Sequence, residues 1–214
     1  PSNICVYDAT TGGGMPAYRG LPEGVNLTKK WGGTAASVPV PAPYKGGAAT
    51  ARCLKTLADG TVDILVNLAL CKGHSNSFGG FTMAMKNHLG TFEPGPVHQG
   101  GGGPDYLIGI NKSPQILGTL DQRSGKVLFP RQQLCIMDAL WASKGGPGGN
   151  PSAQPNSLFM GTCGPVLDYQ VATKFRRDSM KWQINEPVTL RYLKEFGFDP
   201  ADLPNGGRII EPAA

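Results

Sequence analysis

The stretch Val62-Asp-Ile-Leu-Val-Asn-Leu-Ala-Leu70 decides the fold class, because it is a dense run of branched apolar residues. Such a run favours a strand buried inside a sheet. Polar residues begin where that strand would end, at Cys71-Lys72-Gly73-His74. Ligands of open α/β sheets bind at the carboxyl ends of strands, so these residues indicate a functional site.

The segment after the strand predicts a turn and a helix. The glycine pair at 79–80 permits a tight turn with close backbone approach. Residues 81–89 then predict a helix that carries Thr82, Lys86 and Asn87 toward the same site. Strand, polar loop, glycine pair and helix together define the candidate site.

Apolar runs and helical patterns alternate along the rest of the chain. Strands are predicted at 4–7, 134–137 and 157–160, an edge strand or extended segment at 35–44, and helices at 48–57, 81–89, 106–110, 165–176 and 187–196, with a short one starting at Ser113-Pro114. This order predicts an α/β fold with a mixed, mostly parallel sheet, helices on both faces and long glycine-rich loops. We expect one domain over residues 1–214.

The amino-acid composition indicates which classes of partner the chain could bind. The 214 residues include 31 glycines and 19 prolines, interrupted by apolar runs, which favours long ordered loops. The 20 Lys and Arg exceed the 15 Asp and Glu, but only 16% of residues are charged. This balance indicates mild attraction to anions and does not favour a nucleic-acid surface. No run is apolar and long enough to span a membrane, and there is no signal peptide, so a periplasmic and a cytoplasmic location both remain open.

The start of the chain and its cysteines bear on how the chain is organised. The chain begins Pro1-Ser-Asn-Ile-Cys-Val without Met and enters a strand almost at once, so we expect it to be the C-terminal part of a larger protein. A missing N-terminal segment or a separate chain would then complete the sheet. The five cysteines include no Cys-x-x-Cys pair, and Cys71 and Cys135 are predicted to be buried thiols.

Several short motifs occur in the order that a known family shows. The chain resembles the domain of unknown function 362 family over residues 62–197. The resemblance rests on Lys72-x-His74, Thr82-x-x-x-Lys86-Asn87-x-x-Gly90, His98, Asp138, Gly145-Gly-Pro-x-Gly149 and Gly164-Pro-x-x-x-Asp168. Some members carry a ferredoxin module with eight clustered cysteines. This chain has no such cluster, so the resemblance does not imply an iron–sulfur cluster here. Members usually also have an upstream Lys-x-Asn strand motif, which this chain lacks.

Four residues are predicted to carry chemistry: Lys72, His74, Lys86 and Asp138. Two neighbouring lysines repel each other unless an anion lies between them, so they suit a phosphate or carboxylate ligand. His74 titrates near neutrality and can act as a base, a donor or a metal ligand. The alternative is that the lysines pair with aspartates and tie loops together.

Five more residues are predicted to bind the ligand, and two to bind a metal. The ligand-binding set is Asn87, Thr82, Asp168, Gly145 and Gly146. All of these except Thr82 have a structural alternative: Asn87 as a donor to a loop carbonyl or a helix cap, Asp168 at a helix dipole, and the glycines as a lid or a tight crossing, because the Lys-Ser/Thr of a P-loop is absent. His74 and His98, with Glu93, would hold a divalent metal. His88 is predicted to lie on the surface.

These observations favour an enzyme that acts on a small anionic substrate by Lys, His and Asp acid–base chemistry, with a metal assisting. The alternative is a non-catalytic subunit that binds an anion, a metal or a redox partner within a larger assembly. A third interpretation is a structural component whose polar core fixes its loops.

Overall fold

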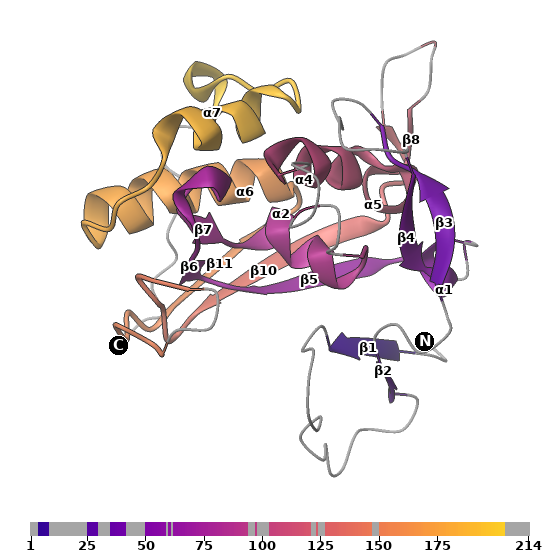
Figure 1. Ribbon diagram of the computed structural model, residues 1–214, viewed down its shortest axis with the longest axis horizontal. Helices are drawn as coiled ribbons and strands as arrows, with labels where there is room; N and C mark the ends of the chain where they lie inside the picture. Colours follow the sequence, from indigo (N-terminus) through magenta and orange to yellow (C-terminus); the bar gives the residue numbers. More distant parts are fainter. Residues whose placement is uncertain are drawn as a thin grey trace.

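A three-stranded sheet lies at the centre of the computed structural model (Figure 1). The structure describes residues 4–8, 25–29, 35–41, 50–58, 60, 62–93, 97, 103–120, 123, 127–146 and 150–203. The strand order is β11–β10–β5, with β5 at Leu65–Leu70, β10 at Gln132–Ala139 and β11 at Ser157–Gly161. Strand β10 pairs parallel with β5 and antiparallel with β11. The predicted α/β class with a mixed sheet is confirmed.

Helices cover one face of this sheet (Figure 1). The covering helices are α2 (Ala84–Asn87), α4 (Gly103–Lys112) and α6 (Gly164–Gln170). Helix α6 continues as a π-helix over Val171–Ser179, and α7 (Glu186–Lys194) packs outside α6 (Figure 1). The buried side chains of the sheet, such as Met137, meet those of α2 and α4 in a shared core.

Short elements surround the central sheet. Strands β1 (Ile4–Asp8) and β2 (Val25–Lys29) pair parallel, whereas β3 (Ala35–Pro39) pairs antiparallel with β4 (Thr50–Leu54), β6 (Lys72–Gly73) with β7 (Phe81–Thr82), and β8 (Thr119–Leu120) with β9 (Val127–Leu128). Other helices among the described residues are α1 (Lys55–Ala58), α5 (Pro114–Leu117) and the 3-10 turns η1 (Asn76–Phe78), η2 (His88–Gly90) and η4 (Pro200–Asp202). No helix within these described ranges is long and apolar enough to cross a bilayer.

Two predicted helices differ from the structure. Residues 48–57 were expected to be helical, but Thr50–Leu54 form strand β4, with Ala51 and Cys53 buried on either side of an exposed Arg52. This alternation is the period of a strand. The expected helix at 81–89 begins instead as strand β7, because Thr82 pairs with Lys72 of β6, and only four residues of α2 follow.

The opposite face of the central sheet is apolar and uncovered by the described residues. Its large side chains remain about half to two-thirds exposed: Val66 46%, Leu68 65%, Leu70 52%, Leu158 54% and Met160 64%. Parallel strands are normally covered on both faces, and helices on both faces were predicted. An apolar patch of this kind marks an interaction surface. We call it the open face.

Candidate functional site

Helix α2 is held in place by a carboxylate from another helix. Asp168 of α6 accepts hydrogen bonds from the backbone N–H groups of Ala84 at 2.8 Å and Met85 at 2.9 Å. It therefore caps the first turn of α2 rather than of its own helix. Burial raises the pKa of Asp168 to about 7, while the two amide bonds act in the opposite direction. The position of Asp168 fixes α2 and, through it, Lys86.

A buried polar network joins α2 to the sheet. Asn67 of β5 donates to the Ala84 carbonyl at 2.8 Å and to Gln132 Oε1 of β10 at 3.0 Å. Asn87 donates to Asn67 Oδ1 at 2.8 Å and to the Leu68 carbonyl at 2.9 Å. Both protons of the Asn87 amide are used inside the protein. Asn87 therefore has a structural role, but its side chain joins α2 to strand β5 and does not cap the helix, which was one of the structural roles predicted for it.

His88 belongs to the same network, so its prediction as a surface residue was wrong. It is 2% exposed and lies 2.6 Å from Gln132 Oε1 through Nε2 and 3.2 Å from Thr91 Oγ1 through Nδ1. Burial lowers the pKa of His88 to about 4. The side chain is turned inward because the chain leaves the α-helix at residue 88 and enters the 3-10 turn η2.

Lys86 is unusual among the candidate site residues because its charged side chain is nearly buried. The residue is only 9% exposed, and its Nζ lies 5.0 Å from the centre of the Phe78 ring. Burial and, secondarily, the charge of Lys72 lower the pKa of Lys86 to about 8. Within the described part of the chain, its ammonium group has no carboxylate partner. A buried cation of this kind calls for an anionic ligand or for deprotonation.

Lys72 and Thr82 are direct cross-strand neighbours in the β6–β7 pair, so their side chains lie on one face. The Thr82 Oγ1 is buried and has no hydrogen-bond partner among the described residues. A buried hydroxyl without a partner is costly unless a ligand supplies one. The structure thus brings Lys72 and Thr82 together, and places Lys86 within electrostatic reach of Lys72.

His74 lies in the loop between β6 and η1, close to the same residues. Its ring is perpendicular to the Phe78 ring, with 5.2 Å between the ring centres, and its Nδ1 lies 3.0 Å from Ser75 Oγ. Phe78 therefore touches both His74 and Lys86. No sequence pattern distinguishes this aromatic, which links two of the predicted site residues.

The glycine loop after β10 forms a tight crossing, which was one of its two structural alternatives. The Gly73 N–H donates to the Gly145 carbonyl at 3.1 Å. A Cβ atom at Gly146 would lie 2.0 Å from the Gly73 carbonyl oxygen, and one at Gly73 would lie 2.1 Å from the Lys144 carbonyl oxygen. Both glycines are therefore required for the backbones to pass.

Arg176 also stabilises this crossing, a role that was not predicted from the sequence. It is completely buried and donates to the carbonyls of Ser143 at 3.1 Å and Lys144 at 3.3 Å. Its guanidinium carbon lies 4.9 Å from the centre of the Trp182 ring. In the sequence it stands beside Arg177 as an ordinary basic pair, whereas in the structure it lies within the π-helix and is buried.

Asp138 lies at the end of β10 and Lys72 just after β5, its parallel neighbour, as predicted, with Asp138 opposite Leu70. The Asp138 side chain, however, alternates with the buried Met137 and Ala139 and so lies on the side of the open face. Its Oδ1 accepts from the Leu140 N–H at 2.8 Å. Asp138 therefore projects from the opposite face of the sheet to α2 and Lys86.

Only one of the two predicted metal ligands, His74, lies among the described residues. His98 lies outside the described residues. Among the described residues, no three His, Cys, Asp or Glu side chains gather with the geometry of a metal site. The thiols of Cys71 and Cys135 are buried, as predicted, and burial raises the pKa of both.

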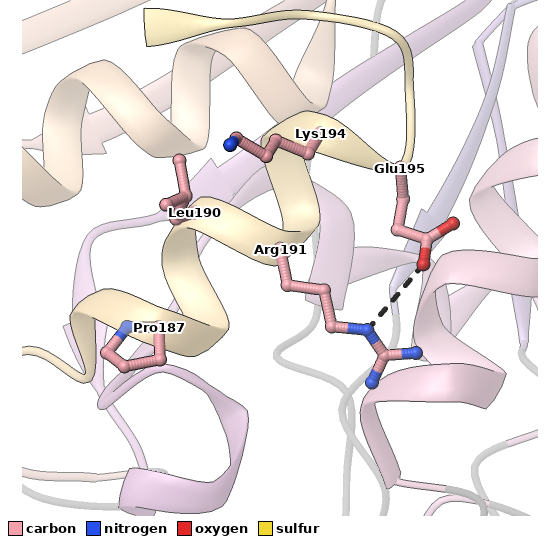
Figure 2. Close-up of a pocket in the computed structure, with 5 residues that line it drawn as sticks. All are labelled: Pro187, Leu190, Arg191, Lys194 and Glu195. Carbon is pink, nitrogen blue, oxygen red and sulfur yellow. Dashed lines mark ion pairs between the residues drawn. The ribbon is translucent and has the colours of Figure 1, made fainter.

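A shallow depression on α7 lies apart from these residues (Figure 2). It is lined by Pro187, Leu190, Arg191, Lys194 and Glu195. Arg191 pairs with Glu195 at 3.6 Å, as Figure 2 shows, and also with Asp105. Its guanidinium is thus already neutralised, and the depression contains none of the predicted site residues.

The fold and the site define an α/β protein with two neighbouring lysines beside the end of a parallel strand. The sequence profile of the family described as "Domain of unknown function (DUF362)" matches residues 31–173, which is more than half of the chain. The chain belongs to this family. No curated protein and no solved structure matches it.

Proposed function

We propose that the chain binds a small anion between Lys72 and Lys86 and acts on it by proton transfer. The observation that carries this proposal is the Lys86 ammonium, which is nearly buried without a carboxylate partner among the described residues. An anion between the lysines would offset both charges, and the unpartnered Thr82 hydroxyl would donate to it.

Lys86 also supplies the means of moving a proton. With a pKa of about 8, its amine is partly unprotonated near neutrality and can serve as a general base. His74, which shares the Phe78 contact, is the second candidate for proton transfer. Asp138 has no part in this proposal, because it projects from the other face of the sheet.

The proposal is tested by anion binding to the purified protein. Phosphate and small carboxylates would be titrated calorimetrically at pH 8 in buffers of different ionisation enthalpy. Because a bound anion raises the pKa of Lys86, binding should be accompanied by proton uptake. Lys86→Met should abolish that uptake, and Lys72→Met should weaken binding by roughly tenfold, the effect of losing one charge-assisted contact.

Lys112 provides a matched control for both substitutions. Its ammonium also lies over an aromatic ring, at 5.6 Å from the Phe196 centre, but it pairs with Glu195 at 3.3 Å. Lys112→Met should leave anion binding unchanged. Binding that is equal in all three variants would overturn the proposed site.

The open face favours a second candidate function, that of a subunit in a larger assembly. We propose a second copy of the chain as its occupant. The exposed apolar side chains amount to on the order of 600 Å², close to the roughly 800 Å² that each partner contributes to a standard interface. Pairing of two such faces would remove them from water.

Size-exclusion chromatography with light scattering tests this assembly. The wild type should give a dimer whose fraction rises with concentration, and a combined Leu68→Glu and Met160→Glu variant should remain monomeric. Phe129 is 87% exposed but lies outside the open face, so Phe129→Glu is the control and should still dimerise. A wild type that stays monomeric at high concentration would contradict the assembly.

A further inference from the structure

Lys86 differs from the other lysines whose ion pairs are described. Lys112 lies 3.3 Å from a carboxylate oxygen of Glu195, and Lys194 lies 3.9 Å from one of Asp199. Lys86 instead packs against the Phe78 ring and is influenced by a second cation, Lys72. These two conditions, an apolar contact and a neighbouring positive charge, are those that activate lysine amines as nucleophiles.

The groups around Lys86 also fit a particular ligand. Lys72 supplies a cation for a carboxylate, and the buried Thr82 hydroxyl supplies a donor that has no partner among the described residues. A molecule with a carbonyl beside its carboxylate would place the carboxylate at Lys72 and the carbonyl carbon toward Lys86. This is the chemical class of the 2-oxo acids.

We propose that Lys86 forms a Schiff base with a small 2-oxo acid whose carboxylate is bound by Lys72. The inference rests on the anion site of the proposed function and adds a covalent step to it. Thr82 would donate to the carboxylate or to the carbonyl oxygen as it gains negative charge.

The step balances without an external oxidant or reductant. The unprotonated Nζ of Lys86 forms a bond to the carbonyl carbon, and one of the two amine protons moves from the nitrogen to the carbonyl oxygen to give a neutral carbinolamine. The hydroxyl group then leaves as water after a second protonation, and the nitrogen retains a proton as the iminium. Overall, one amine, one carbonyl and one proton give one iminium and one water. Addition of water restores Lys86.

The low pKa of Lys86 sets the expected selectivity. At pH 7.5 an amine with a pKa of about 8 has a neutral fraction roughly two hundredfold larger than that of an ordinary lysine. Because Lys86 is mostly buried, part of this advantage will be lost to restricted access. We therefore expect Lys86 to react at least roughly tenfold faster than Lys112 or Lys194.

The test uses pyruvate as the probe and cyanoborohydride to reduce the iminium to a stable amine. Peptide mapping by mass spectrometry should locate the adduct at Lys86, with a rate that rises through about pH 8. Lys86→Arg, which keeps the charge, should remove that adduct. Lys72→Met should shift the pyruvate dependence to roughly tenfold higher concentration. Acetone, which has no carboxylate, should label Lys86 much less efficiently.

The outcomes separate this inference from the proposed function. Anion binding that is lost in Lys86→Met, without selective trapping at Lys86, would overturn the Schiff base and leave the anion site standing. Labelling of Lys86 at the same rate as Lys112 would likewise overturn it. Failure of both anion binding and trapping would remove the proposed function as well.

Discussion

Replacing His88 by Gln should remove a specific part of the pH dependence of stability. Gln132 Oε1 accepts hydrogen bonds, so we assign the proton to His88 Nε2, 2.6 Å away. The Asn67 amide, whose Nδ2 lies 3.2 Å from the same nitrogen, then gives its two protons to Gln132 Oε1 and the Ala84 carbonyl. His88 Nδ1 accepts from the Thr91 hydroxyl at 3.2 Å. The network assigns His88 to its neutral form, and a second proton would place a charge in the core.

The sign and size of the pH-dependent contribution of His88 to the unfolding free energy follow from the difference between its pKa in the folded and in the unfolded chain. In the folded protein the pKa is lowered from 6.5 to about 4. The unfolded chain therefore binds a proton first, and the contribution of His88 is complete above about pH 6.5 and is lost as pH falls toward 4. This loss amounts to about 1.4 kcal/mol at pH 5.5 and about 2.5 kcal/mol at pH 4.5.

The assay is urea unfolding at pH 7.5, 5.5 and 4.5 for the wild type and His88→Gln. Each protein is compared with itself across pH, so the intrinsic cost of the substitution cancels. The wild type should lose stability relative to the variant by the amounts given above. Asp168, whose pKa is raised to about 7, has the opposite sign: its contribution is present below about pH 4 and is lost as pH rises through 7. Asp168→Asn should therefore remove that opposite slope and serves as a control.

Parallel pH profiles of the wild type and His88→Gln, differing by less than about 0.5 kcal/mol, would refute the buried neutral network. A titration of the His88 ring by NMR gives a direct check. A midpoint near 6.5 would show that the imidazole meets water in the folded protein.

Three further predictions concern the crossing, the cap and the metal. Gly146→Ala should cost about 1–3 kcal/mol of unfolding free energy, because its Cβ would overlap a backbone oxygen, whereas Gly145→Ala, with open space around its Cβ, should change stability by less than about 0.5 kcal/mol in the same denaturation assay. Asp168→Ala should cost about 3–5 kcal/mol by leaving two buried N–H groups unpaired, and Asp168→Asn, which keeps one acceptor, should cost about half as much; equal losses would contradict the cap. If His74 and His98 hold a divalent metal, elemental analysis should find about one equivalent in the wild type and none in His74→Ala or His98→Ala, and a wild type without metal would contradict that prediction.

The apolar run at 62–70 predicted a strand, and one is found at Leu65–Leu70, but it was expected to be buried and instead lies at the edge of the described sheet with one face exposed. The polar residues after it, Lys72 and His74, could be predicted as site residues because strand ends in α/β sheets meet at one edge. The pattern could not predict which face each side chain would take. Asp138 shares that edge with Lys72 but projects toward the open face, since the face depends on register and strand length.

The contacts around α2 could not be predicted from the sequence, because they join residues that are far apart along the chain. Asp168 is separated by more than eighty residues from the amides that it caps, and local patterns do not contain such a pairing. Phe78, which touches both His74 and Lys86, has no local feature that distinguishes it from any other aromatic. Arg176 is buried against the carbonyls of Ser143 and Lys144, more than thirty residues away, which local patterns do not contain.

The sequence by itself predicted the α/β class and the parallel pairing of the two strands that lead to the candidate site, both of which the structure contains, and it proposed Lys72, His74 and Lys86 as the polar residues of that site. These follow from periodicity and from the order of short motifs, which are local properties of the chain. The tertiary structure alone decided that Lys86 is nearly buried beside an aromatic ring and a second lysine. Burial and neighbouring charge set the protonation and reactivity of an amine, and both arise only when distant segments pack together.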